Sequence, residues 1–202
     1  SPNAITGLGF QPDWVWIKKR AAVISHAIFD SSRGVTSAGA TNKAIGSNRS
    51  DAEGNGNGGL SVFGSDGFTL VDGTSGSYPR SLVNDSATYV AWNWKANGGT
   101  TSSNTDGSIT STVQANTTAG FSIVTATSPS SGTWSVGHGL SKKPDMIIQK
   151  YRSGTGRWTT WHNILTSGQY LGLNETNAVA SSGTPFNFTI TDSVIGGNAD
   201  YD

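Results

Sequence analysis

The sequence predicts an all-β protein made of two tandem antiparallel β-sandwiches. The first reason is an internal duplication, because residues 7–20 (GLGFQPDWVWIKKR) and residues 139–152 (GLSKKPDMIIQKYR) align without a gap at a spacing of 132 residues. Six of the fourteen aligned positions are identical. The second reason is that short runs of β-branched and aromatic residues alternate with turn residues about every ten positions, without sustained helical periodicity. We call the duplicated segments the anchor blocks.

The duplication divides the chain into a first domain at residues 1–97 and a second at residues 98–202, each of ordinary domain size. Copy one ends with the strand-like run 89–94, whereas copy two stops before any such run, so we expect the second sandwich to be incomplete at its C-terminal end. A sheet that lacks a strand has an unpaired edge. Two explanations stay open: the chain is a window from a longer protein, which we favour, or neighbouring subunits supply the missing strands.

The elements of the first domain begin with the anchor strand, predicted at residues 14–18. Pro12 precedes it, where its fixed φ suits the start of a strand, and basic residues follow the apolar run. Residues 34–59 are rich in Gly, Asn, Ser and Asp and predict a long loop. The turn Ser65-Asp66-Gly67 is typical of a hairpin. Further strands are predicted at residues 25–30, 43–45, 60–63, 67–71 and 88–95.

The second domain follows a linker of Gly, Ser, Thr and Asn predicted at residues 97–106. Its first two strands, at residues 108–114 and 120–125, form a pair ahead of the second anchor block. The run at residues 158–163 aligns with residues 26–31 at the same spacing of 132 residues. The remaining strands are predicted at residues 134–139, 170–173 and 187–191.

Side-chain alternation assigns two faces to the anchor strand, with Trp14 and Trp16 on one and Val15 and Ile17 on the other. In copy two the first face is again apolar, whereas the second carries Gln149. We therefore expect Trp14 and Trp16 to face the core; exposed, the two indoles would instead form a platform for stacking on sugars. The same reasoning places three residues of the strand that ends the first domain in the core: Val90, Trp92 and Trp94.

Composition excludes several classes of function. Thirteen basic residues balance thirteen acidic residues, so the chain lacks the basic excess that binding to nucleic acid requires. No apolar run is long enough to span a membrane. Cysteine is absent, which excludes disulfides and cysteine-based zinc sites.

Several motifs together resemble a known family. They are GFQPDWVWIK, SHAIFDSSRG, SDGFTL and ATYVAWNWKANGG in copy one, and the connector from TDGSITSTVQ to KKPDMII in copy two. This combination resembles the tail-fibre and virion structural proteins of marine tailed phages, such as those that infect cyanobacteria. The resemblance implies tandem jelly-roll domains of the concanavalin or laminin-G kind, an extracellular location in the virion tail or fibre, and assembly with copies of itself or with other virion proteins. It also implies recognition of host-surface glycans, and it offers no catalytic residues.

One loop has the composition of a calcium site. Oxygen-bearing side chains recur at alternate positions, as calcium prefers; they are Asp51, Glu53, Asn55 and Asn57. The loop lacks the downstream glutamate of a helical calcium loop, and a solvated polar turn is the simpler interpretation. No other cofactor is predicted.

The sequence does not predict an enzyme. His26, His138 and His162 do not fall in a nucleophile motif, and Asp13 and Asp145, the acids that recur in both copies, follow a proline where turn capping explains them. We therefore expect a non-enzymatic virion segment. The alternative is a carbohydrate-binding module, with glycan contacts from three aromatic residues: Tyr78, Trp134 and Trp158.

Overall fold

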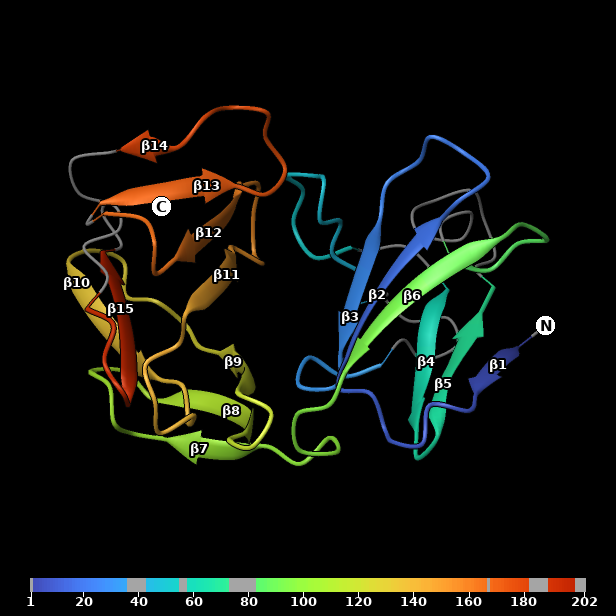
Figure 1. The fold of residues 1–202 in the computed structure, drawn as a ribbon, viewed down its shortest axis with the longest axis horizontal. Helices are drawn as coiled ribbons and strands as arrows, with labels where there is room; N and C mark the ends of the chain where they lie inside the picture. The colour runs from blue at the N-terminus through green and yellow to red at the C-terminus, as the bar shows by residue number, and fades with distance from the viewer. Residues whose placement is uncertain are drawn as a thin grey trace. The chain divides into compact units, whose positions relative to one another are not determined.

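The structure is a computed structural model of the chain. The residues that it describes are 2–35, 43–54, 58–72, 83–166, 168–181 and 189–198. The chain divides into two compact units: unit 1 contains residues 1–99 and 152–155, and unit 2 contains residues 100–151 and 156–202. The elements of both are strands, and every strand pairing is antiparallel, as the sequence predicts (Figure 1).

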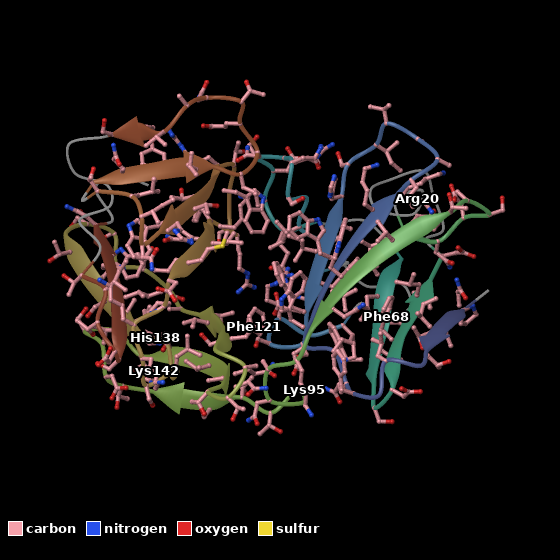
Figure 2. All side chains as sticks on the ribbon, in the orientation of Figure 1. Arg20, Phe68, Lys95, Phe121, His138 and Lys142 are labelled. Atoms are coloured by element: carbon pink, nitrogen blue, oxygen red, sulfur yellow. The ribbon has the colours of Figure 1, made fainter. Side chains whose placement is uncertain are left out.

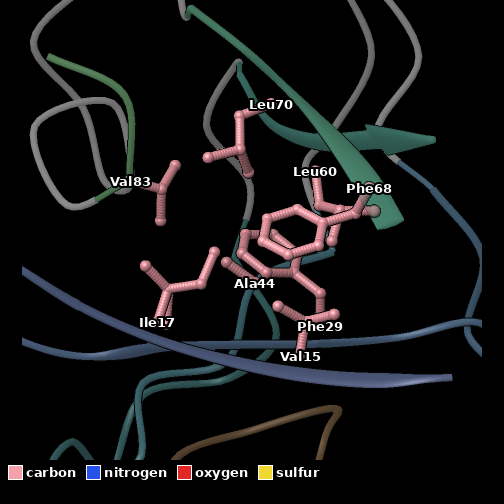
Figure 3. Close-up of a cluster of buried hydrophobic side chains, with 9 residues drawn as sticks. Val15, Ile17, Phe29, Ala44, Leu60, Phe68, Leu70 and Val83 are labelled. Carbon is pink, nitrogen blue, oxygen red and sulfur yellow. The ribbon is translucent and has the colours of Figure 1, made fainter. Parts of the chain in front are cut away.

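Unit 1 contains two three-stranded sheets, ordered β3-β2-β6 and β1-β5-β4. The strands are β1 (Asn3–Thr6), β2 (Trp14–Lys19), β3 (Ala27–Asp30), β4 (Gly59–Gly64), β5 (Gly67–Val71) and β6 (Tyr89–Trp94). The two sheets share one apolar cluster (Figure 3). Its members are Val15, Ile17, Ala27, Phe29, Ala44, Leu60, Phe68, Leu70 and Val83.

The face predicted for the tryptophans is wrong. Val15 and Ile17 are 0% and 1% exposed and belong to the core, whereas Trp14 and Trp16 lie on the opposite face of β2 and are only partly buried. The prediction for β6 fails in the same way, because Tyr89 and Ala91 contact the core cluster instead of Val90, Trp92 and Trp94. The physical reason is volume: the space between the sheets is filled by medium-sized aliphatic residues and phenylalanines, and close packing excludes four indoles.

Unit 2 contains three sheets, ordered β7-β8-β9, β10-β15 and β11-β12-β13-β14. The strands of the first two sheets are β7 (Ser102–Asn104), β8 (Ser111–Asn116), β9 (Phe121–Thr125), β10 (Thr133–Gly137) and β15 (Val194–Asn198). Those of the third sheet are β11 (Met146–Lys150), β12 (Trp158–His162), β13 (Gln169–Gly172) and β14 (Ala180–Ser181).

The internal duplication is visible in the strand register. Trp14 pairs with Asp30 and Ile17 pairs with Ala27, and the residues 132 positions later pair in the same way, from Met146 with His162 to Gln149 with Thr159. The ends of the two hairpins also match, since the amide N–H of Ser31 donates to the carbonyl of Asp13 and that of Asn163 donates to the carbonyl of Asp145, both at 2.9 Å. The two anchor blocks therefore build the same hairpin.

Several strands have no counterpart in the sequence-based prediction. They are β1, β7, β14 and β15. The predicted linker at residues 97–106 contains β7, a run of Ser and Asn that pairs with β8 although its composition is typical of a loop. β15 contains two glycines, Gly196 and Gly197, which disfavour a strand by propensity. Within the described ranges, no helix is long and apolar enough to cross a membrane.

Candidate functional site

The outer face of sheet β3-β2-β6 carries four tryptophans, which we call the tryptophan face. Trp14 pairs with Trp94 and Trp16 pairs with Trp92 across β2 and β6, so the indoles form two adjacent rows. The ring centroids lie 4.7 Å apart in the first row, 5.8 Å apart in the second, and 5.9 Å apart between Trp14 and Trp16. The face is therefore one continuous aromatic surface.

The rings of the tryptophan face are tilted and do not form one flat plane. The interplanar angle is 44° between Trp14 and Trp94 and 62° between Trp16 and Trp92. Trp92 is 44% exposed, which leaves much of its indole accessible to solvent. An accessible indole next to polar groups is suited to ligands with both apolar and hydroxyl-bearing surfaces.

His26 provides a polar group beside these rings. The indole Nε1–H of Trp16 donates to Nδ1 of His26 at 2.9 Å. Burial, together with the charge of Lys18, lowers the pKa of His26, so the imidazole stays neutral and remains an acceptor at neutral pH. The ammonium of Lys18 donates to the carbonyl oxygens of Lys19 and Ala22.

One of the three predicted glycan residues, Trp158, does not form a surface site. Trp158 is 5% exposed in β12 and is part of the interior of unit 2. Tyr78 lies outside the described residues.

Trp134, the third predicted glycan residue, borders a shallow pocket of about 250 Å³. The pocket is lined by Ser108, Thr133, Trp134, Ser135, Thr189, Val194, Gly196 and Gly197. The indole lies against the backbone of Gly197, where a Cβ atom would come within 2.8 Å of the ring. Its Nε1–H is buried and has no acceptor among the described residues. Trp134 thus combines a packing role with a donor that no described residue accepts.

Two of the four predicted calcium ligands, Asp51 and Glu53, form ion pairs with basic side chains. Asp51 forms an ion pair with Arg49. Glu53 lies 2.8 Å from Nε of Arg152, 3.4 Å from Nζ of Lys43 and 3.8 Å from Nη1 of Arg33. Burial would raise the pKa of Glu53, but these three charges together hold it below the ordinary value. Glu53 is thus neutralised by its own neighbours.

The other two predicted ligands, Asn55 and Asn57, lie outside the described residues. Within the ranges that the structure describes, no group of three or more acidic or histidine side chains is placed to hold a metal ion.

Other acids and histidines in the described ranges have structural partners. Asp13 is 0% exposed and accepts hydrogen bonds from the amides of Ala96, Gly98 and Gly99 at 2.7, 2.9 and 2.7 Å. His138, inside unit 2, accepts from the amide of Leu140 through Nδ1 (Figure 2). The carboxylate of Asp13 therefore caps a turn at residues 96–99, far along the sequence, whereas the prediction had it cap the turn beside Pro12.

The tryptophan face could have been found from the sequence. The anchor strand offers β-branched Val15 and Ile17 on one side and two indoles on the other, and β-branched residues suit a tightly packed interior better than a row of indoles does. The role of His26 has no such signal, because its counterpart in the second copy is Trp158.

Comparison with known proteins identifies a family. No curated protein and no solved structure matches the chain. A protein family described as "Domain of unknown function (DUF7483)" matches residues 1–200, which is nearly the whole chain. The chain therefore belongs to this family of unknown function.

Proposed function

We propose that the chain is a non-enzymatic structural segment of a tailed-phage virion, of the tail-fibre kind. It comprises two tandem β-sandwich modules of the jelly-roll type, similar to concanavalin or laminin-G domains. It is extracellular and assembles with copies of itself or with other virion proteins. Repetition of one module suits this role, because several weak contacts with a host surface add up when the modules are linked.

The observation that supports this proposal is the repeated hairpin. Two copies with the same register, spaced by 132 residues, are the product of duplication of a structural unit. The acids that recur in both copies, Asp13 and Asp145, bond to residues of their own hairpin. The motifs that resemble phage fibre proteins supply the virion assignment.

Immunoelectron microscopy tests the virion assignment. Antibodies raised against the purified chain are applied to particles from a lysate of the phage that encodes it. We expect gold label on the tail or its fibres. Label confined to cell debris, with bare particles in the same field, would contradict the assignment.

Carbohydrate binding is a second candidate function, and the tryptophan face favours it. Its four indoles, with Trp92 44% exposed, form an aromatic surface next to a neutral histidine. Such a surface suits a neutral sugar, whose apolar ring face stacks on indole while its hydroxyls bond to polar neighbours. This candidate is compatible with host-surface contact by a virion segment.

Affinity electrophoresis tests this second candidate. The chain runs through native gels that contain laminarin or hydroxyethyl cellulose, two neutral β-linked glucans. We expect retardation that Trp92→Ala reduces at least about tenfold in apparent affinity, since one stacking contact supplies about 1.4 kcal/mol. Val62→Ala is the matched control, because Val62 is 47% exposed in unit 1 on a different sheet. Equal mobility of all three proteins with and without glucan would exclude these ligands.

A further inference from the structure

The two anchor strands differ in the number of their neighbours. β2 is the central strand of its sheet and lies between β3 and β6. β11 is the first strand of its sheet, and among the described residues it pairs only with β12. The side of β11 that corresponds to the β6 side of β2 is therefore a sheet edge in the described part of unit 2.

In unit 1, β6 is held on β2 in two ways. It pairs with all six residues of β2, and the amide of Asp13 donates to the carbonyl of Trp94 at 2.7 Å. After β6 the chain turns through Gly98 and Gly99, which have φ values of +61° and +80°. This turn directs three amides, those of residues 96, 98 and 99, to the carboxylate of Asp13. An acid at the start of the anchor strand thus binds the exit of the neighbouring strand.

Unit 2 keeps the accepting half of this arrangement. Asp145 stands where Asp13 stands, and Nδ2 of Asn163 donates to it as the hydroxyl of Ser31 donates to Asp13. Asp145 is nevertheless exposed, and within the described part of the chain its carboxylate accepts from no backbone amide. Met146, which replaces Trp14, is 51% exposed. The edge therefore has its acceptor in place and an apolar side chain open to solvent.

We propose that the edge of β11 is a docking edge for an extended strand of the β6 type. The partner is a polypeptide segment with the pattern of residues 89–99: an alternating aromatic strand followed by a Gly-Gly turn. The strand adds to the sheet through backbone hydrogen bonds, and the turn presents its amides to Asp145. The two glycines are required because positive φ strains other residues.

This partner is distinguished from an arbitrary strand by the Asp145 contact. Any extended peptide can pair with an open edge, but only one with the glycine turn satisfies the carboxylate. The chain itself shows the bound form, since β2, β6 and Asp13 form the same arrangement in unit 1. The proposal concerns the edge of unit 2 and does not depend on the virion assignment.

The single methionine of the chain provides a direct test. The full chain, labelled with ¹³C at the methyl group of methionine, is titrated with a synthetic peptide of residues 87–99 (ATYVAWNWKANGG). In unit 1 the ring of Trp94 lies 4.7 Å from that of Trp14. The same indole of the bound peptide will cover Met146, so we expect its methyl signal to move upfield and saturate.

Two variants of the chain distinguish docking at Asp145 from non-specific binding of the peptide. Asp145→Asn keeps the shape of the side chain and removes the charged acceptor, and we expect at least about tenfold weaker peptide binding. Asp106→Asn is the control, because Asp106 is an exposed acid elsewhere in unit 2, and it is expected to bind as the unaltered chain does. A peptide with Val90→Pro and Trp92→Pro, which removes two backbone donors that face β2 in unit 1, is expected not to bind.

Three results would overturn the proposal. The methyl signal could stay in place at saturating peptide, the proline peptide could shift it equally, or Asp145→Asn could bind as tightly as Asp106→Asn. The first shows that the edge does not accept the strand. The second and third show that association is not strand addition anchored on Asp145.

Discussion

The anchor strands β2 and β11 share a sequence pattern and a hairpin register but have different surroundings. Asp13, at the start of β2, is 0% exposed and binds three amides that follow β6. Asp145, at the start of β11, is exposed. The comparison shows that the duplicated block determines the anchor strand and the strand that pairs with it in the hairpin. The burial of the acid at the start of the anchor strand depends instead on a further strand, β6 in unit 1.

The two strands also differ on both of their faces. On the core side, Ile17 is 1% exposed, whereas its counterpart Gln149 is only partly buried. On the outer side, Trp14 contacts Trp94, whereas its counterpart Met146 is 51% exposed. Unit 1, in which β6 pairs with the anchor strand, thus has the more apolar core face on that strand. It also has the larger side chains on the outer face of that strand, and these are aromatic. Matched substitutions at aligned positions test whether these differences matter for stability.

Exchange of the two acids for asparagine is expected to give the largest contrast. Both oxygens of Asp13 accept hydrogen bonds from N–H or O–H groups, so Asp13→Asn places an amide donor against other buried donors. We expect it to lower the free energy of unfolding by about 4 kcal/mol, and Asp145→Asn by less than about 0.5 kcal/mol. Guanidinium unfolding followed by tryptophan fluorescence measures both.

Hydrogen exchange tests the same contrast at individual backbone amides. In Asp13→Asn the amides of residues 96, 98 and 99 are expected to lose protection, while the amides of β12 keep theirs. Similar destabilisation by the two substitutions would mean that the third strand does not set the importance of the acid.

The sequence predicted much of this arrangement for specific physical reasons. Pattern and turn residues located β2, β5 and β12, because β-branched runs next to Gly, Pro and Asp are strong local signals. The duplication gave the equivalence of Asp13 and Asp145. The face of the indoles was wrong because apolar character alone was taken to mean burial, whereas large apolar residues are often found on surfaces.

Other features depend on contacts between residues distant in sequence, which local patterns do not encode. Asp13 is 83 residues from Ala96, the first amide that it binds. β7 and β15 form because a neighbouring strand offers a partner, although their own composition of Ser, Asn and Gly disfavours it. The pairing of Trp16 with His26 likewise follows from the fold of the segment between them.

Exchange of the core-side residues is expected to give an intermediate effect. Ile17→Gln buries an amide in the apolar cluster and removes packing, so we expect a loss of about 3 kcal/mol in the free energy of unfolding. The reciprocal change, Gln149→Ile, is expected to alter it by less than about 0.5 kcal/mol, since Gln149 is only partly buried. The measurement is the denaturant midpoint at constant slope. Equal effects would indicate that the two faces are equally buried in solution.

Acidification is expected to give the smallest effect, through the unit that carries the Trp16–His26 pair. Burial and the charge of Lys18 lower the pKa of His26 in the folded state. Below the ordinary value of 6.5, the unfolded chain therefore binds more protons than the folded chain, and the free energy of unfolding falls as the pH is lowered. Protonation also removes the acceptor that Nδ1 offers to Trp16. The aligned positions in unit 2 are Ile148 and Trp158, which do not titrate.

The control for this effect is His26→Gln, which keeps an acceptor that does not titrate. Between about pH 8 and about pH 5, we expect the denaturant midpoint to fall further for the unaltered chain than for the variant. The remaining titratable groups, His138 and His162 included, are common to both proteins, so the difference between the two curves isolates His26. Parallel curves would show that the pKa of His26 is the same in the folded and unfolded states, and that the charge of Lys18 does not act on it.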